Sequence, residues 1–277
     1  MVLAMAAFAL EDMFFKAATV TAPVGQSLIL FGLIGFLIFT VWTQRRREPV
    51  FHPASLSRGL LLRSGIELLG RLFYALALAY APLASTSAIL QATPIVVTLG
   101  AIVFFRESVG WRRWAAMAVG FIGVLIVIRP LPGSFEWASL FAVLGMLGFA
   151  GRDLATRASP PAMSVAQLGV LGFTVLMVAG GVLWAIDGFA LAPMGARAVG
   201  ALSLAALFGV AAYAALTQAM RMGEIGFVAP FRYTRLIFAL ILAVLVFGER
   251  PDIWVLSGAA LIVAAGLYSF LRDGRAR

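Results

Sequence analysis

Apolar stretches long enough to cross a membrane follow one another along almost the whole chain, separated by short arginine clusters or by proline and glycine. A helix needs roughly 20 mostly apolar residues to span the ~30 Å hydrocarbon layer. Residues 72–105 hold no charged side chain, and neither do residues 17–44 and 158–186. Such unbroken runs favour helices over the alternating pattern of a membrane barrel. The pattern predicts ten spans, at about 2–20, 24–43, 58–80, 82–105, 111–129, 135–157, 163–186, 198–220, 225–247 and 253–271.

The composition agrees with an all-α, polytopic membrane protein. Hydrophobic residues make up 62% of the 277 positions, and the mean hydropathy is +1.02. Ten spans leave no room for a soluble catalytic domain, and no nucleophile elbow, zinc-protease motif or phosphate loop is present. The chain has no cysteine and one histidine, His52, which lies beside Pro53 between two spans. We therefore expect no enzyme activity, no cofactor and no metal site.

The net charge of +9 is distributed in a way that predicts membrane orientation. Cytoplasmic segments are enriched in lysine and arginine, and placing the N-terminus inside gives such an excess. This topology puts both termini in the cytoplasm and the protein in the inner membrane. The charge is then explained by topology, so no nucleic-acid partner is expected. The inner side would hold Arg45, Arg46, Arg47, Arg58, Arg63, Arg106, Arg112, Arg113, Arg152, Arg157, Arg221, Arg272, Arg275 and Arg277, and the outer side Lys16, Arg129, Arg197 and Arg250.

Two regions of the chain repeat at one spacing, which is close to half the length of the sequence. Residues 8–17 match residues 149–158 at an offset of 141, with an aspartate aligned on an aspartate. Residues 95–107 match residues 237–249 at an offset of 142, with a glutamate aligned on a glutamate. Because two separate regions agree on the spacing, we infer a duplication of five spans.

An odd number of spans per half requires that the second half enters the membrane with the opposite orientation. The predicted halves are residues 1–130 and 135–277, joined in one membrane domain. Inverted repeats are typical of secondary transporters, which hold substrate near the membrane midplane where the halves meet. A channel or passive pore for small solutes is the alternative, and a membrane enzyme is the third hypothesis.

Short motifs at matching places in the two halves resemble the EamA-type transporters of the drug/metabolite transporter superfamily. A span ends in phenylalanine and then glutamate at residues 105–107 and 247–249, and a glycine-bearing span follows each. A proline lies inside the fourth span, within residues 91–94. The resemblance implies two inverted five-helix repeats, a central cavity between the third, fourth, eighth and ninth helices, and movement of small metabolites, often amino acid export. The second half departs from the pattern, because Leu236 stands where a proline matching Pro94 is expected.

Charged side chains inside the predicted spans mark a candidate site, because each costs roughly 2.5–3.5 kcal/mol on insertion scales. Glu67 and Arg71 are four residues apart on the third span, in the better order for pairing, and Tyr74 shares their face. Arg232 and Arg235 lie on the ninth span. Arginine suits a substrate carboxylate because its guanidinium donates two parallel hydrogen bonds. The alternatives are that Glu67 and Arg71 only neutralise each other, and that Arg232 extends to the membrane interface.

Uncharged polar residues extend this site. Ser87, Gln91, Pro94 and Thr98 follow one another at spacings of four, three and four, so they form one stripe along the fourth span. Pro94 can bend that span, and we expect it to act as a hinge together with Pro230. Helix packing is the alternative role of such a stripe. The predicted substrate-binding residues are Glu67, Arg71, Tyr74, Ser87, Gln91, Tyr213, Gln218, Arg232, Tyr233 and Arg235, with Tyr233 at the position that corresponds to Gln91.

Two further charged pairs predict local salt bridges near span ends. Asp12 precedes Lys16 by four residues, and Asp153 precedes Arg157 by four residues. Small residues in the last span of each half predict close helix packing, at Gly120, Gly123 and Gly258.

The sequence thus predicts a secondary transporter that moves a small metabolite by alternating access. Amino acids are the expected substrate and membrane lipids the expected surroundings. Export of amino acids follows from the family resemblance alone. The sequence does not determine the oligomeric state, and a monomer would suffice for the predicted site.

Overall fold

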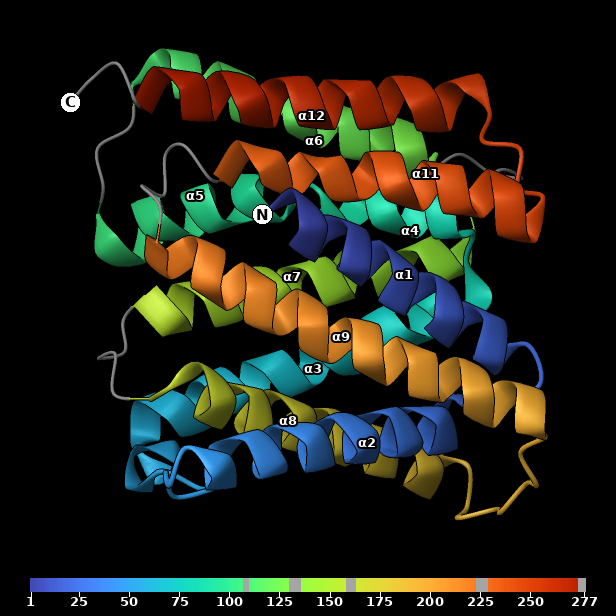
Figure 1. Cartoon of the computed structure of the whole chain (residues 1–277). Helices are drawn as coiled ribbons and strands as arrows, with labels where there is room; N and C mark the ends of the chain where they lie inside the picture. The colour runs from blue at the N-terminus through green and yellow to red at the C-terminus, as the bar shows by residue number, and fades with distance from the viewer. Residues whose placement is uncertain (107–109, 130–135, 158–162, 223–228, 274–277) are drawn as a thin grey trace.

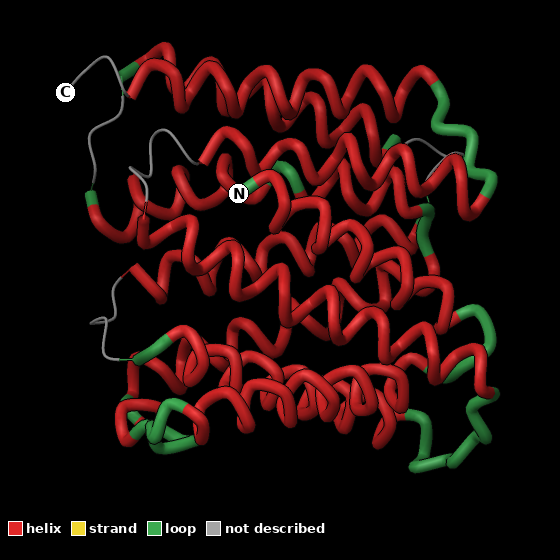
Figure 2. Tube along the Cα trace, in the orientation of Figure 1, coloured by secondary structure: helices red, strands yellow, loops and turns green. Residues whose placement is uncertain are grey.

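The computed structural model describes residues 1–106, 110–129, 136–157, 163–222 and 229–273. In that part of the chain the regular elements are helices, and Figure 2 shows no strand there. The helices lie side by side as rods that run between two opposite ends of the molecule (Figure 1). The first half forms α1 (Val2–Thr19), α2 (Val24–Arg45), η1 (Pro53–Leu56), α3 (Arg58–Tyr80), α4 (Leu83–Leu90), α5 (Thr93–Phe105) and α6 (Trp111–Ile128). The second half forms α7 (Trp137–Arg157), α8 (Val165–Ile186), α9 (Ala196–Met222), η2 (Ala229–Tyr233), α11 (Thr234–Phe247) and α12 (Ile253–Asp273).

The hydropathy of these helices confirms an all-helical, polytopic membrane protein. Among the described residues, α2, α4 with α5, α7, α8 and α9 are long and apolar enough to cross a membrane. α6 and α12 contain shorter apolar segments. α1 and α3 are long, but they carry charged residues within their apolar runs. The two helices that interrupt the hydrophobic pattern therefore point to where polar chemistry is concentrated.

Several helix ends lie where the sequence supplies a cap. Ser57 begins α3, and its hydroxyl accepts a hydrogen bond from the N–H of Leu60 at 3.4 Å. Ser164 begins α8 in a capping box, in which Ser164 and Gln167 each accept a hydrogen bond from the other's backbone N–H. Gly248 ends α11 with a φ of 63°, a left-handed conformation that glycine adopts without steric cost.

The fourth predicted span is two helices rather than one. α4 ends at Leu90 and α5 begins at Thr93, which corrects the single helix expected over residues 82–105. Pro94 is the second residue of α5, where its missing N–H is tolerated, and the hydroxyl of Thr93 donates to the carbonyl oxygen of Leu90 at 2.5 Å. Pro94 therefore lies at an interruption where a new helix starts, and its role as a hinge stays a prediction.

The ninth predicted span is interrupted at the corresponding place. η2 ends at Tyr233, the position equivalent to Gln91, and α11 follows it directly. Leu236 occupies the place of a second proline, yet the helix type still changes here. Pro230 lies within η2, and residues 223–228 of the predicted span are outside the described part of the chain.

The two halves pack against each other as inverted copies. α3 packs along α7 and α1 packs along α9, and these contacts are equivalent when the halves are exchanged. α2 packs along α8 and α6 along α12, and each of these pairs maps onto itself in the same exchange. α5 and α11, which correspond, end at opposite ends of the bundle (Figure 1). The second half is therefore turned over relative to the first, as predicted.

Glycine allows the closest helix approaches in the bundle. A Cβ atom on Gly148 of α7 would lie 2.4 Å from Cα of Gly70 on α3. A Cβ atom on Gly123 of α6 would lie 2.8 Å from the carbonyl oxygen of Gly258 on α12. The packing role predicted for Gly123 and Gly258 is confirmed, because any side chain there would push the two backbones apart.

Candidate functional site

Nine charged side chains gather between α1, α3, α7, η2 and α11, and we call them the charge network. Five guanidiniums and four carboxylates give the network a net charge of +1 when all are ionised. Within the described residues, no group of three or more histidine, aspartate or glutamate side chains is placed to bind a metal ion. The network consists of Glu11, Asp12, Arg63, Glu67, Arg71, Arg152, Asp153, Arg232 and Arg235.

Glu67 lies at the centre of the network and has no exposed surface. Its carboxylate oxygens are 3.3 Å from a guanidinium nitrogen of Arg63 and 3.6 Å from one of Arg71, both on α3. Arg152 of α7 approaches it to 3.5 Å. The predicted Glu67–Arg71 pair is confirmed, and it is part of a cluster in which three cations surround one buried anion.

Asp12 pairs across the bundle rather than along its own helix. Its Oδ2 atom accepts hydrogen bonds from Nη2 and Nε of Arg235 at 2.6 and 3.2 Å, and from the hydroxyl of Tyr74 at 3.0 Å. The predicted Asp12–Lys16 salt bridge is wrong, because the packing of α1 against α3 and α11 gives Asp12 closer partners. α1, α3 and α11 are thereby joined at one carboxylate.

Asp153 has one close and one distant partner. Its Oδ1 atom accepts hydrogen bonds from Nε and Nη2 of Arg152 at 3.0 and 2.7 Å. Its Oδ2 atom lies 3.9 Å from Nη2 of Arg232, and these two side chains are 25% and 31% exposed. The other pairs of the network are more deeply buried on at least one side. The predicted partner Arg157 has its side chain outside the described residues.

Glu11 is the least compensated carboxylate of the network. Its Oε1 atom lies 4.0 Å from Nη1 of Arg71. Its Oε2 atom is buried and accepts no hydrogen bond within the described part of the chain. Gly209 of α9 faces this carboxylate, and a Cβ atom there would lie 3.2 Å from Oε2.

Aromatic rings support the arginines of the network. The guanidinium carbons of Arg71 and Arg152 lie 5.7 and 5.2 Å from the centre of the Phe149 ring. Arg235 lies 4.9 Å from the centre of the Phe8 ring. Such contacts stabilise a cation by the negative face of the ring. Phe8 and Phe149 occupy matching positions in the repeat, so each half contributes one ring to the same task.

The predicted site residues fall into two groups. Five of them belong to the network or bond to it: Glu67, Arg71, Tyr74, Arg232 and Arg235. Gln91 lies at the break between α4 and α5, and its Nε2 atom donates to the carbonyl oxygen of Arg232 at 3.2 Å. The interruptions of the two halves therefore meet, as their equivalence predicts.

The remaining predicted residues lie around this centre or away from it. Tyr213 is half-buried on α9, with its ring against Phe39 of α2 at 5.9 Å. Tyr233 is buried at the end of η2. Ser87 is buried in α4 and Gln218 lies on an exposed face of α9, and the described contacts do not bring either to the network.

The end of the bundle farther from Asp153 is held by a contact that we call the α3–α4 clamp. Nζ of Lys16 donates to the carbonyl oxygen of Ala81 at 2.5 Å, at the end of α3. The carboxylate of Glu249 accepts hydrogen bonds from the N–H groups of Leu83 and Ala84, at 2.7 and 3.0 Å. A carboxylate is favourable there because the first N–H groups of a helix lack internal partners and carry partial positive charge.

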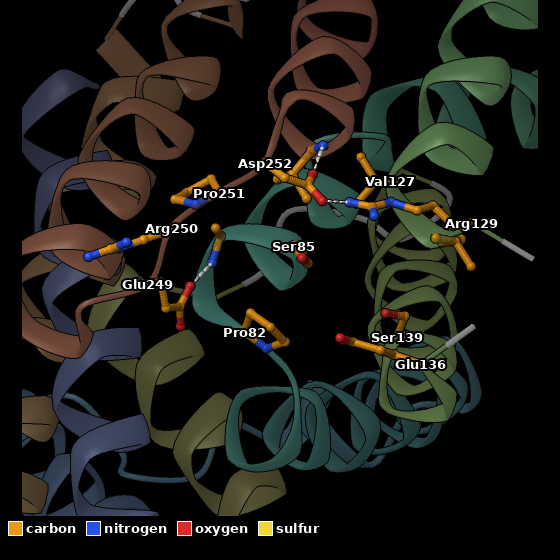
Figure 3. Close-up of a pocket in the computed structure, with 13 residues that line it drawn as sticks. Pro82, Ser85, Val127, Arg129, Glu136, Ser139, Glu249, Arg250, Pro251 and Asp252 are labelled. Atoms are coloured by element: carbon orange, nitrogen blue, oxygen red, sulfur yellow. Dashed lines mark hydrogen bonds and ion pairs between the residues drawn. The ribbon is translucent and has the colours of Figure 1, made fainter. Parts of the chain in front are cut away.

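A pocket of 350 Å³ borders this clamp and is separate from the charge network (Figure 3). It lies between the start of α4, the end of α6, the start of α7 and residues 249–252. Asp252 pairs there with Arg129 and accepts a hydrogen bond from the N–H of Val255 at 3.0 Å. Partial desolvation opposes ionisation of Asp252, but the hydrogen bonds from Val255 and Arg129 outweigh it and lower the pKa of this carboxyl below its usual value.

Sequence reasoning missed five members of the network. Arg63 and Arg152 are close enough to span ends to be counted as cytoplasmic charges, and Glu11 has no partner at helical spacing. Asp12 and Asp153 have local partners at four residues, which offered a simpler explanation. One available signal was the repeat itself, since Asp12 and Asp153 align and each meets an arginine from the η2–α11 segment.

Comparison with known proteins points to transport. Residues 1–129 and 136–271 match the EamA-like transporter family. The chain is 31% identical over 220 residues to a riboflavin transporter of Rhizobium johnstonii, covering 79% of this chain and 70% of that protein. It is 27% identical over 255 residues to an S-adenosylmethionine uptake transporter of Rickettsia bellii, covering 89% and 82%. It is 26% identical over 268 residues to the pseudopaline exporter CntI of Pseudomonas aeruginosa, covering 95% and 92%.

A solved crystal structure shares the fold. It aligns with 99% of this chain and 97% of its own, with a TM-score of 0.63 and 18% sequence identity. The family match covers both halves, and the named relatives carry small molecules rather than catalyse reactions. The chain therefore belongs to the EamA-like transporter family and is a membrane transporter of the drug/metabolite transporter superfamily.

Proposed function

We propose that this transporter carries amino acids or closely related zwitterionic metabolites, and that it works by alternating access. Relatives named for S-adenosylmethionine, riboflavin and pseudopaline support a small-molecule substrate. The substrate class is inferred from the charge network, which offers both guanidiniums and carboxylates inside the bundle.

The pair Asp153–Arg232 is the single observation that carries this proposal. Its atoms are 3.9 Å apart and both side chains are about a quarter to a third exposed, whereas Glu67 at the centre is fully buried. A zwitterion that enters between them would place its carboxylate on Arg232 and its ammonium on Asp153. One long ion pair is thereby replaced by two short ones, so the substrate compensates the charges that it separates.

Alternating access is supported by the difference between the two ends of the bundle. The α3–α4 clamp holds one end through Lys16 and Glu249. Asp153 lies in the last turns of α7, toward the opposite end, where the network is most exposed. Inverted repeats allow the closed and open arrangements to be exchanged between the ends. A continuous pore would require both ends to be open at once.

We further propose that the protein lies in the inner membrane with both termini in the cytoplasm. The turn between α2 and α3 contains or borders Arg45, Arg46, Arg47 and Arg58, and α12 ends on the same side of the bundle (Figure 1). Such an excess of arginine is typical of cytoplasmic loops. The halves are proposed to divide near residues 130–135, as the sequence predicts.

Counterflow in liposomes tests the proposal. Purified protein should exchange a radiolabelled mixture of the standard L-amino acids against unlabelled amino acids inside the vesicles, with saturation. Arg232→Gln and Asp153→Asn should each raise the KM about tenfold or more, because a hydrogen bond to a charged group is worth about 1.5–3 kcal/mol. Arg250→Gln and Asp187→Asn, at exposed positions, serve as matched controls. Flux that neither saturates nor shows counterflow would instead indicate a channel.

A further inference from the structure

Glu11 differs from the other carboxylates of the network in how weakly the protein compensates its charge. Its nearest guanidinium nitrogen is 4.0 Å away, and its buried Oε2 atom accepts no hydrogen bond within the described residues. The Oε2 atom of Glu67 also accepts no hydrogen bond there, but guanidinium nitrogens surround this carboxylate at 3.3, 3.5 and 3.6 Å. Glu11 is only 7% exposed, so little bulk water reaches it. A buried carboxylate in a membrane helix with so few partners requires a functional explanation.

The charged groups that face Glu11 come from three helices. Asp12 follows it on α1, Arg71 reaches it from α3, and Arg235 acts on it from α11. α9 presents Gly209, and α2 presents a phenylalanine ring beside it. A second carboxylate and an apolar wall favour the neutral form of an acid, whereas the arginines oppose it. Tyr74 of α3 also interacts electrostatically with Glu11, although its hydroxyl donates to Asp12. Glu67, Tyr213 and Arg232, on α3, α9 and η2, interact with other members of the network.

We propose that Glu11 binds and releases a proton during the transport cycle and so couples transport to the proton gradient. This inference rests on the transport function proposed above and names its coupling ion. Glu67 is excluded from that role, because a proton there would leave three guanidiniums around a neutral group.

Glu11 stands at one end of a line of alternating charges that reaches the proposed substrate pair. Every second member is an arginine, and each arginine inside the line lies between two carboxylates. The line runs through Glu11, Arg71, Glu67, Arg152, Asp153 and Arg232, with successive N···O distances of 4.0, 3.6, 3.5, 2.7 and 3.9 Å. A change of charge at Glu11 is therefore transmitted by contacts as well as through space.

The sign of the coupling follows from the charges. A proton on Glu11 raises the net charge of the network from +1 to +2, which strengthens the attraction of the network for the carboxylate of the substrate. The same proton releases Arg71 toward Glu67, and the following pairs readjust until Asp153 holds Arg232 less strongly. Both effects favour a substrate carboxylate on Arg232. Proton and substrate therefore bind together, and by reciprocity the substrate also favours the proton.

Co-transport has a directional consequence. A proton gradient directed into the cell would drive substrate uptake, which is opposite to the export that the family resemblance implies. The named relatives include an uptake transporter and an exporter, so both directions occur on this fold.

The test uses the full-length protein in liposomes, with the membrane potential held at zero by valinomycin and equal potassium on both sides. The probe is the radiolabelled mixture of standard L-amino acids. An exterior more acidic by about one pH unit should drive accumulation of up to about tenfold when one proton accompanies each substrate. Glu11→Gln represents the neutral form permanently, so it should lose gradient-driven accumulation, and its counterflow should depend less on pH than that of the unmodified protein. Glu136→Gln, at an exposed position, should accumulate like the unmodified protein.

The outcomes separate this inference from the proposed function. Accumulation by Glu11→Gln equal to that of the unmodified protein would overturn the role of Glu11 and leave transport intact. No saturable counterflow in the unmodified protein would overturn the proposed function. Infrared difference spectra between acidic and neutral pH then test whether Glu11 itself takes up a proton. A carboxyl band that is missing from Glu11→Gln supports the assignment, and identical spectra contradict it.

A second variant covers the case in which the glutamine variant does not fold. Glu11→Asp keeps a carboxyl group and lengthens its distance from Arg71. It should restore gradient-driven accumulation with a changed pH optimum. Counterflow without accumulation in Glu11→Asp would count against the proposal.

Discussion

Replacing Glu67 by glutamine tests whether one carboxylate holds the charge network together. The change preserves the shape of the side chain and removes one negative charge. Three guanidiniums at 3.3–3.6 Å then surround an amide, and the net charge of the network rises from +1 to +2. From the sequence alone, Glu67→Gln would be expected to alter the pH dependence of transport. Because three arginines surround Glu67, we expect the main effect of Glu67→Gln to be a loss of stability instead.

The size of the stability loss depends on which carboxylate partners each arginine keeps. Breaking a buried ion pair by removing one partner costs roughly 3–5 kcal/mol, because the remaining charge stays buried. Arg152 keeps Asp153 at 2.7 Å and Arg71 keeps Glu11 at 4.0 Å, so we expect the lower end of that range, about 3 kcal/mol. Each kcal/mol lowers the unfolding temperature by about 2–4 °C in soluble proteins of similar size, which gives about 6–12 °C here.

Thermal unfolding in detergent, followed by tryptophan fluorescence, measures this effect. The double variant Glu67→Gln with Arg63→Met restores the net charge of +1 and should recover part of the lost stability. Glu136→Gln removes an exposed carboxylate and should leave the unfolding temperature unchanged. A Glu67→Gln protein that unfolds within a degree or two of the unmodified protein would refute the central role of this carboxylate.

Three further predictions follow from the contacts outside the network. Glu249→Gln removes the negatively charged cap of α4, at a cost of roughly 0.5–2 kcal/mol. A cysteine introduced at Pro82 of this cysteine-free chain should then react faster with a membrane-impermeant maleimide. An unchanged rate would contradict the clamp. Gly148→Val would force a side chain against Gly70, so α3 and α7 should separate at a cost of roughly 1–3 kcal/mol. An unchanged unfolding temperature would show that the two helices adjust without this cost. Asp252 has a lowered pKa in the folded state, so its contribution to stability is present above the unfolded value near 3.8 and is lost as pH falls through the folded-state pKa. The stability difference between the unmodified protein and Asp252→Asn should therefore be constant at neutral pH and disappear in strong acid. A difference that persists in strong acid would contradict the stabilising role of the Asp252 carboxylate.

The site was only partly predictable from the sequence, because helical spacing identifies partners along one helix and says nothing about neighbouring helices. Glu67 and Arg71 were predicted to pair, and they do. Asp12 was predicted to pair with Lys16 by the same reasoning, and it pairs instead with Arg235, which is 223 positions away. In both cases the carboxylate takes the cations that packing brings nearest.

The interruption of the fourth span was foreseeable in part. Pro94 indicates a bend or break in the helix, since it removes one backbone donor and its ring crowds the preceding turn. The second half has no proline at the corresponding position, yet η2 ends beside the equivalent residue, Tyr233. A hydrogen bond from Nε2 of Gln91 to the carbonyl oxygen of Arg232 joins the two interrupted segments and gives one backbone acceptor of η2 a partner.

The membrane-protein class of the chain and the inversion of its second half could be predicted from the sequence. These properties depend on hydrophobic length and on an internal repeat, both of which are read along one dimension. Packing between the helices sets which charges form the network, which of its carboxylates is least compensated and which end of the bundle is clamped. An unpaired charge is costly away from water, so each one takes whichever partner packing supplies. The partners lie on helices that are far apart in the sequence, so they meet only after the helices have packed.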